Sequence, residues 1–189
     1  MVRRPRSRRF LSRGGDKLEG ALEAFEVDVA GCVAADLGAS VGGFTDCLLQ
    51  RGAARVYAVD TGYGVLGWKL RQDRRVVVLE RKNALHVTLP EPLDLVVVDV
   101  GWTRLGLILP RAVALLGARG DVVALLKPQY EAEAFEREGG VVLPDCLEDV
   151  ATRVIQGLEQ SDIPVSKRVE SKVPGSGGNR EFFLLVEKR

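Results

Sequence analysis

Residues 35–45 read Ala35-Asp36-Leu37-Gly38-Ala39-Ser40-Val41-Gly42-Gly43-Phe44-Thr45, the pattern of a strand that ends, a glycine-rich turn and a helix that begins. Glycines are needed where a backbone turns sharply or approaches a ligand closely. In a doubly wound α/β sheet, ligands bind in the crevice at the carboxyl ends of the strands, which is where this turn would lie. The segment therefore predicts a small-molecule site, although a tight turn without a ligand fits the same letters.

Short apolar runs rich in β-branched residues alternate, on both sides of this turn, with stretches long enough for a helix. Such alternation predicts parallel strands joined by crossover helices. Continuous apolar runs such as residues 95–98 fit strands covered on both faces, although a buried helix gives the same pattern. The expected strands are residues 32–36, 55–60, 76–80, 93–100, 121–126, 165–169 and 181–186, and the expected helices are residues 15–25, 45–51, 65–72, 105–116 and 147–161.

Length and composition indicate one folded domain. The chain has 189 residues, of which 46% are hydrophobic and 28% charged, as in an ordinary soluble globule. Its apolar stretches fall far short of the roughly 18 residues of a membrane helix, and its N-terminus lacks the apolar core of a signal peptide. We therefore expect a cytoplasmic protein with a basic N-terminal arm at residues 1–13 and one domain at residues 14–189.

Positive charge is concentrated at the N-terminus. The net charge is +1, with 27 Lys and Arg against 26 Asp and Glu, yet the first 17 residues hold seven of those cations and a single acid. A basic segment on a nearly neutral body is typical of proteins that contact phosphate. A solvated tail is the alternative interpretation of the same segment.

The number and spacing of the histidine and cysteine residues argue against a metal site. His86 is the only histidine, which excludes mechanisms that need two, including most zinc hydrolysis. The cysteines are Cys32, Cys47 and Cys146, an odd and widely spaced set that fits neither a disulfide framework nor a zinc site. We expect no metal, and we expect the thiols to lie in the core.

A hydrolase motif also lies within the glycine-rich turn. Residues 38–42 match the G-x-S-x-G nucleophile elbow, which would make Ser40 a nucleophile. That mechanism needs a histidine base placed after an acid late in the chain, whereas His86 precedes both Asp94 and Asp99. The elbow also normally follows a central strand, and here it follows the first. The hydrolase interpretation is therefore disfavoured.

The strand after the turn ends in an acid that suits an adenosine. Asp60 lies about twenty residues beyond the glycines, from where a carboxylate can accept hydrogen bonds from both ribose hydroxyls. The spacing alone leaves nicotinamide, flavin and S-adenosylmethionine (SAM) open. Ser40 occupies the third position of the dinucleotide fingerprint, where its second glycine belongs, so a pyrophosphate site is the less favoured of these.

Further segments resemble one known family. These are residues 12–18 (SRGGDKL), 42–49 (GGFTDCLL), 56–60 (VYAVD), 70–73 (LRQD), 127–129 (KPQ) and 178–183 (GNREFF). With the glycine-rich turn they resemble the FtsJ-like ribose methyltransferases, most closely the TlyA branch, whose members are named as hemolysins and as ribosomal RNA 2′-O-methyltransferases. The resemblance covers nearly the whole chain from Ser12 onward. It implies a Rossmann-like, SAM-dependent fold with a central, mostly parallel seven-stranded sheet, helices on both faces and an antiparallel final strand.

The resemblance also implies a catalytic tetrad, which would comprise Lys17, Asp99, Lys127 and Glu181. Lys127 is notable without the resemblance, because a charged residue that closes the apolar run 122–126 is poorly explained by packing. A buried ammonium needs partners, which Asp99 and Glu181 could supply. The implied cofactor contacts are Asp36, Gly38, Ala39, Ser40, Gly42, Gly43, Phe44, Asp60, Asn83 and Asp99.

The implied reaction is attack of a ribose 2′-oxygen on the methyl group of SAM. A hydroxyl is a poor nucleophile at neutral pH, so the site must remove its proton or stabilise the developing alkoxide. Lys127 suits either role, because burial lowers the pKa of a lysine while neighbouring carboxylates raise it. We expect Asp99 to orient Lys127, and Lys17 and Glu181 to hold the ribose and balance charge.

The expected substrate is RNA, either ribosomal RNA or a ribosomal subunit. The basic N-terminal segment would contact its phosphates. The residues expected to bind RNA are Arg3, Arg4, Arg6, Arg8, Arg9, Arg13 and Trp102. Trp68 and Tyr130 are further stacking candidates, but the helical spacing around Trp68 favours core packing. The chain departs from the family in having only a short arginine-rich segment where the branch usually has a small RNA-binding module, and Val100-Gly101-Trp102 where Ser-Phe is common.

Two other functions stay open at this stage. One is a non-catalytic RNA-binding protein that keeps the fold, which a failure to bind SAM would favour. The other is a membrane-active, hemolysin-like protein, for which the sequence offers no spanning segment and no strongly apolar amphipathic helix. We expect no stable association with membranes.

Overall fold

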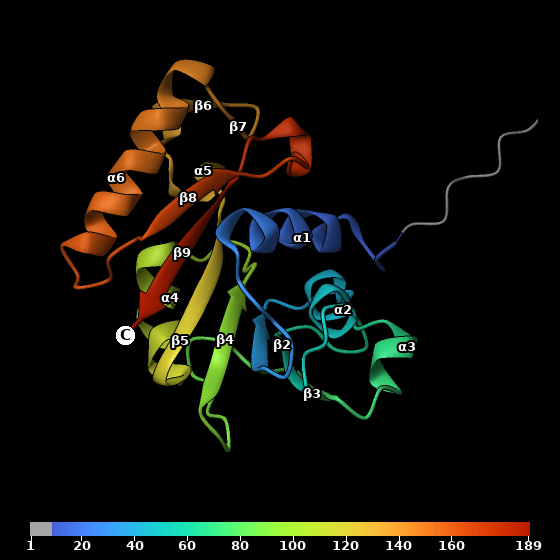
Figure 1. Ribbon diagram of the computed structural model, residues 1–189. Coiled ribbons are helices and arrows are strands. Elements are labelled where there is room, and N and C mark those ends of the chain that lie inside the picture. The colour runs from blue at the N-terminus through green and yellow to red at the C-terminus, as the bar shows by residue number, and fades with distance from the viewer. Residues whose placement is uncertain (1–8) are drawn as a thin grey trace, which may run out of the picture.

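The computed structural model describes residues 9–189, so Arg3, Arg4, Arg6 and Arg8 lie outside the described residues. A seven-stranded sheet with the strand order β3-β2-β1-β4-β5-β9-β8 forms the centre of the molecule (Figure 1). Its strands are β1 (Val33–Leu37), β2 (Arg55–Asp60), β3 (Val76–Glu80), β4 (Leu93–Val98), β5 (Leu116–Leu126), β8 (Lys167–Glu170) and β9 (Phe182–Lys188), and a separate hairpin pairs β6 (Arg137–Glu138) with β7 (Val141–Val142). The helices are α1 (Arg13–Phe25), α2 (Gly43–Gln50), α3 (Trp68–Arg71), α4 (Leu105–Leu115), α5 (Pro128–Glu131) and α6 (Leu147–Glu159).

The first five strands are parallel, and the last two are antiparallel to their neighbours. The expected central, mostly parallel seven-stranded sheet is therefore confirmed, including the antiparallel closing strand. β1 pairs with β2 on one side and with β4 on the other, so the strand order reverses at β1. Such a reversal opens a crevice beyond the carboxyl ends of the strands. The glycine-rich turn follows β1 directly and lies at this crevice.

Helices cover both faces of the sheet. On one face α1, α2 and α3 contribute side chains such as Leu18, Leu48 and Leu70 to one apolar cluster. On the other face α4 and α6 contribute side chains such as Ile108 and Val150 to a second cluster. The central strands place alternate residues in each cluster, which is why their sequences read as continuous apolar runs.

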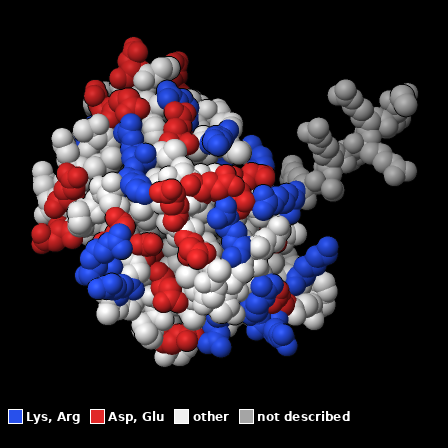
Figure 2. All heavy atoms as spheres, viewed as in Figure 1, with Lys and Arg blue, Asp and Glu red and all other residues white. Residues whose placement is uncertain are grey.

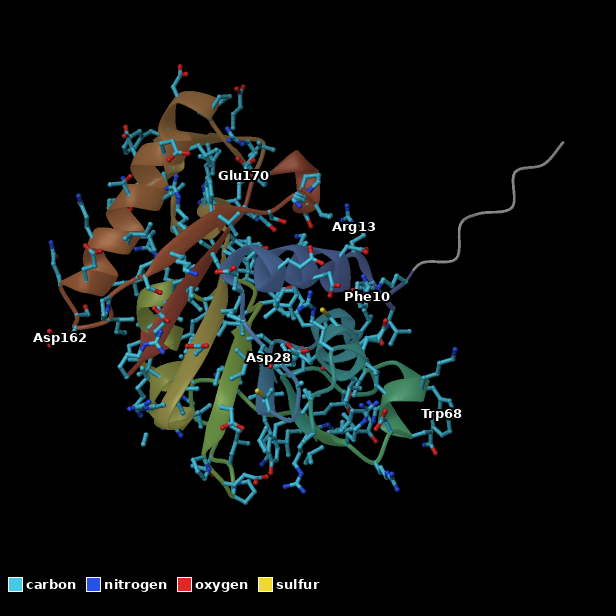
Figure 3. All side chains as sticks on the ribbon, in the orientation of Figure 1. Phe10, Arg13, Asp28, Trp68, Asp162 and Glu170 are labelled. Atoms are coloured by element: carbon cyan, nitrogen blue, oxygen red, sulfur yellow. The ribbon has the colours of Figure 1, made fainter. Side chains whose placement is uncertain are left out.

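The folded domain reaches back beyond residue 14. Phe10 is buried in the cluster beneath α1, and the Leu11 amide donates a hydrogen bond to the Asp46 carboxylate at 2.8 Å. Ser12 caps α1, since its hydroxyl accepts from the Gly14 amide at 3.2 Å. The last residues of the expected arm are thus part of the packed structure (Figure 3).

The differences from the expected elements are local. The predicted helix at residues 65–72 is wrong in its first half, because α3 spans only Trp68–Arg71 and residues 61–67 form a loop. That loop contains three glycines, which weaken helix formation. The strand expected to start at residue 121 begins at Leu116, and the small hairpin of β6 and β7 was not predicted.

Candidate active site

Two hollows open at the crevice beyond β1, β4 and β5. The first hollow has a volume of about 430 Å³ and the second about 260 Å³, and Gly38, Ser40 and Asp99 line both. Volumes of this order suit a small-molecule ligand. The first hollow is further lined by Val59, Asp60, Thr61, Lys82, Asn83, Ala84, Leu85, Val100, Gly101, Trp102, Thr103, Ile108 and Lys127, and the second by Ser12, Arg13, Gly14, Lys17, Ala39, Val41, Gly43 and Phe44.

The glycine-rich turn fits closely against the end of β4. Gly38 has a φ of +92°, and a Cβ atom there would lie 2.6 Å from the Asp99 carbonyl oxygen. Only glycine satisfies both the left-handed backbone and the close approach. Ser40 also has a positive φ, of 49°. At Gly38 the turn therefore presents bare backbone to both hollows.

Asp60 holds this turn in place. One carboxylate oxygen accepts a hydrogen bond from the Ser40 amide at 2.8 Å, and the other accepts from the Gly62 amide at 2.7 Å. A carboxylate oxygen can accept two hydrogen bonds, so each retains one site for a ligand. Asp60 lines the first hollow, as a ribose-binding acid must.

Asp36 has a different position from the one expected of a cofactor contact. It is fully buried and lines neither hollow, and its Oδ2 accepts a hydrogen bond from the Thr45 hydroxyl at 2.6 Å. Its Oδ1 has no hydrogen-bond partner among residues 9–189. Burial raises the pKa of Asp36 to about 7, against the effect of Thr45 and with a further increase from Asp99. Asp36 thus binds Thr45 of α2 rather than facing a ligand. Gly42, the other expected cofactor contact of this kind, also lines neither hollow.

Lys127 and Asp99 form an ion pair between the hollows. The two residues follow β5 and β4, and Lys127 Nζ lies 2.6 Å from Asp99 Oδ1. Lys127 Nζ also donates to the Val100 carbonyl oxygen at 3.2 Å. Burial raises the pKa of the Asp99 carboxyl, and the adjacent Lys127 ammonium opposes this increase. The juxtaposition expected of this amine and this acid is present.

Lys17 and Glu181 form a second ion pair, between α1 and the start of β9. Lys17 Nζ lies 2.6 Å from Glu181 Oε2, and the Gln129 side-chain amide donates to Glu181 Oε1 at 3.2 Å. Glu181 was expected to help neutralise Lys127; in the structure it pairs with Lys17. Gly175 packs so closely against the Glu181 carboxylate that a Cβ atom there would collide with it. Gln129 belongs to the KPQ segment quoted above but was given no role, and Gly175 did not stand out, because nothing in the local pattern indicates a partner so distant along the chain.

Of the described residues that were expected to bind RNA, Trp102 and Arg13 line the hollows and Arg9 does not. Trp102 is exposed at the wall of the first hollow, and its ring centroid lies 4.9 Å from that of Tyr130. Arg13 lines the second hollow, while Arg9 pairs with Glu19 at 2.9 Å. Trp68 was expected to pack in the core and instead lies exposed on α3 (Figure 3).

The hydrolase interpretation gains no support from the geometry. Among the described residues, His86 lines neither of the two hollows that contain Ser40. No group of three or more His, Cys, Asp and Glu residues within residues 9–189 is arranged to hold a metal ion. In the same part of the chain, no helix has the length and apolar character to cross a bilayer.

Known proteins share both the sequence pattern and the fold. The profile of the FtsJ-like methyltransferase family matches residues 10–188. The 16S/23S rRNA (cytidine-2′-O)-methyltransferase TlyA of Mycobacterium tuberculosis is 46% identical over 95% of this chain and 69% of its own length. A Streptococcus thermophilus protein named as a hemolysin has 39% identity and a TM-score of 0.91, over 98% of this chain and 69% of that one. In fold alone, the magnesium protoporphyrin IX methyltransferase of Synechocystis, solved with bound SAM, has 14% identity and a TM-score of 0.63, over 94% of this chain and 79% of that one.

Proposed function

This chain belongs to the FtsJ-like methyltransferase family, and on that premise we propose that it methylates the 2′-oxygen of a ribose in ribosomal RNA. The observation that carries the proposal is the pair of lysine–carboxylate contacts at the two hollows, with Lys127 lining the first, Lys17 the second and Asp99 both. Lys127 with Asp99 and Lys17 with Glu181 each meet at 2.6 Å, at the crevice where this fold binds its ligands. The substrate named for the M. tuberculosis relative supports ribosomal RNA as the acceptor.

The lining of the first hollow fits S-adenosylmethionine, the cofactor of this fold. Asp60 retains an acceptor site on each carboxylate oxygen for the ribose hydroxyls. The Asn83 side chain uses its oxygen to accept from the Leu85 amide at 2.9 Å, and its NH₂ group has no hydrogen-bond acceptor within the described residues. The side-chain-free edge at Gly38 lets a ligand approach the backbone. Bound there, the cofactor supplies a methyl group on a positively charged sulfur.

Lys127 is the residue that acts on the hydroxyl of the acceptor ribose. Its Nζ donates to the Val100 carbonyl and lies 2.6 Å from Asp99 Oδ1. An ammonium has three N–H groups, so at least one is left for the 2′-oxygen. As an ammonium it donates a hydrogen bond to the developing alkoxide; as a neutral amine it accepts the hydroxyl proton. Asp99 fixes Nζ in the same position for either role.

Lys17 and Glu181 orient the acceptor from the second hollow. Lys17 lines that hollow with Asp99 and Arg13, and Glu181 holds its ammonium in place. Two cations and two anions leave the group of four neutral, which limits the penalty for desolvating it. Arg13 adds a cation for an RNA phosphate at the same opening. Trp102 and Tyr130 offer aromatic faces on which an unpaired base stacks.

Transfer of labelled methyl groups tests the proposal. The full chain is incubated with methyl-labelled SAM and purified bacterial ribosomal subunits, and the RNA is digested to nucleosides. We expect label in 2′-O-methylated nucleosides, and we expect it to disappear with Lys127→Ala. Label confined to the bases would refute the ribose assignment. Binding of SAM and RNA without any transfer would make the chain a non-catalytic RNA-binding protein.

A further inference from the structure

An exposed aromatic surface lies at the outer edge of the sheet, beyond β2 and β3. Tyr63 is 71% exposed and Trp68 is 74% exposed, although such rings usually bury most of their area. Trp68 projects from α3 at the margin of the molecule (Figure 3). Within the described residues, the Trp68 ring has no aromatic or cation–π partner. We call Tyr63, Trp68, Lys69, Arg81 and Lys82 the edge surface.

The loop that carries Tyr63 is fixed by hydrogen bonds. The Glu80 carboxylate accepts from the Gly64 amide at 3.0 Å and from the Val65 amide at 3.2 Å, and it also pairs with Arg71. The Gly67 amide donates to the Val41 carbonyl at 3.1 Å, which ties the loop to the glycine-rich turn. A surface held in this way is preformed, so a ligand pays little ordering entropy on binding.

The segment that carries these two rings is rich in positive charge. Residues 61–82 contain six Lys and Arg against two Asp and Glu, and both acids are already paired, Asp73 with Arg75 and Glu80 with Arg71. Lys69, Arg81 and Lys82 are exposed and form no ion pair within residues 9–189. The Arg81 guanidinium carbon lies 4.2 Å from the centroid of the Tyr63 ring, a cation–π contact that keeps the charge beside the aromatic face.

The opposite flank of the molecule has the reverse character. Residues 131–162 contain nine Asp and Glu against two Lys and Arg. Figure 2 shows acidic side chains gathered over α6 and the β6–β7 hairpin, and basic side chains at the lower right, over the region of α3. A polyanion is therefore attracted to the edge surface and repelled from the other flank.

We propose that the edge surface binds the single-stranded stretch of substrate RNA that flanks the target nucleotide. This rests on the proposed function above. Bases stack on Tyr63 and Trp68, while Lys69, Arg81 and Lys82 contact phosphates. Lys82 also lines the first hollow, so the edge surface is continuous with the active site. Rings interspersed with unpaired cations suit nucleic acid better than an apolar protein partner, which would leave those cations desolvated.

Binding of a fluorescein-labelled U12 oligoribonucleotide to the full chain tests the assignment. We expect Tyr63→Ala and Trp68→Ala each to weaken binding about 5- to 100-fold, the usual loss of one stacked base. Phe135→Ala is the matched control, because Phe135 is an aromatic residue with 78% exposure on the acidic flank, and its removal should leave binding unchanged. Replacing Lys69 and Arg81 with alanine should lower the slope of log K against log salt by about 1.4.

Tryptophan fluorescence gives a direct readout at the surface itself. The chain contains two tryptophans, so Trp102→Phe leaves Trp68 as the single reporter. Stacking on a base should quench its emission as U12 is added. If the wild-type chain methylates ribosomal RNA while Tyr63→Ala and Trp68→Ala bind U12 normally, the edge surface is not an RNA site and the proposed function still holds.

Two other results would also overturn the assignment. If these variants alter the sedimentation coefficient of the chain but not its affinity for U12, the surface contacts protein. If the wild-type chain neither binds U12 nor methylates ribosomal RNA, the edge-surface assignment and the proposed function fail together.

Discussion

The two ion pairs of the active site are alike in chemistry and distance but differ in their surroundings. The side chains of Lys17 and Glu181 are 11% and 2% exposed, whereas those of Lys127 and Asp99 are 16% and 26% exposed. Glu181 is braced by Gln129 and by the close approach of Gly175. Asp99, in contrast, lines both hollows. The more enclosed pair joins α1 to the start of β9 while Lys17 also lines the second hollow, and the more open pair is the more accessible to a ligand.

Because of this difference, we expect the two pairs to contribute differently to stability and to catalysis. Breaking a buried ion pair leaves a charge without compensation, which is strongly destabilising. Breaking a pair at the wall of a hollow leaves the remaining charge in contact with solvent. We therefore expect damage to the Lys17–Glu181 pair to appear mainly in unfolding, and damage to the Lys127–Asp99 pair mainly in turnover.

Lys127→Ala should have the largest effect. With Lys127 in its proposed role on the 2′-hydroxyl, its loss is expected to reduce methyl transfer about 10²- to 10⁴-fold. Turnover is measured with labelled SAM, alongside SAM affinity and urea unfolding, neither of which should change greatly. Near-normal turnover in this variant would remove Lys127 from the mechanism. It would also contradict the expectation that damage to the Lys127–Asp99 pair appears mainly in turnover.

Glu181→Ala should cost about 3–5 kcal/mol of unfolding free energy, because it leaves the Lys17 ammonium buried without its partner. Urea denaturation followed by far-ultraviolet circular dichroism measures the loss. The control is the double variant Lys17→Met with Glu181→Leu, which removes both charges and should recover most of the stability. A Glu181→Ala variant as stable as the wild type would show that the enclosed pair is not a structural clamp.

Asp36 should make the stability of the folded chain depend on pH. Its folded pKa of about 7 lies above the ordinary value of 3.8, chiefly through burial and in part through Asp99. The folded chain therefore binds a proton that the unfolded chain releases, and stability falls as pH rises from about 4 through 7. Relative to Asp36→Asn, the wild type should lose up to about 4 kcal/mol over that range. Parallel stability curves for the two proteins would contradict the raised pKa.

Trp102→Ala should have the smallest effect, on RNA affinity alone. A stacked base contributes about 1–3 kcal/mol, and the exposed ring beside Lys127 is placed to provide it. Affinity for ribosomal RNA is measured by filter binding, with Trp102→Phe as the variant that keeps an aromatic face. Equal losses from Ala and Phe would indicate a role other than stacking.

Sequence reasoning predicted the fold well because its signals are periodic and local. The five parallel strands and most helices follow from apolar runs bounded by glycine, proline and charge. Lys127 was identifiable because an ammonium at the end of a buried strand has no packing explanation. Its pairing with Asp99 followed because both residues end neighbouring strands of one parallel sheet.

What sequence reasoning missed depends on contacts between distant segments. Lys17 and Glu181 are separated by 164 positions, and nothing local shows that Glu181 turns toward α1 rather than toward Lys127. The family resemblance implied that Asp36 contacts the cofactor, but its carboxylate accepts a hydrogen bond from Thr45 and lines neither hollow. Trp68 fits a helical apolar pattern, yet α3 is only four residues long and does not turn that ring inward.

The bond between α1 and β9 also bears on how the protein is made. Residue 17 leaves the ribosome early, but its partner at position 181 is synthesised only after six of the seven strands of the main sheet. Until then the Lys17 ammonium lacks the Glu181 carboxylate that pairs with it in the folded chain. A nascent chain is thus expected to fix the position of Lys17, the residue proposed to orient the acceptor, only at the last stage of translation.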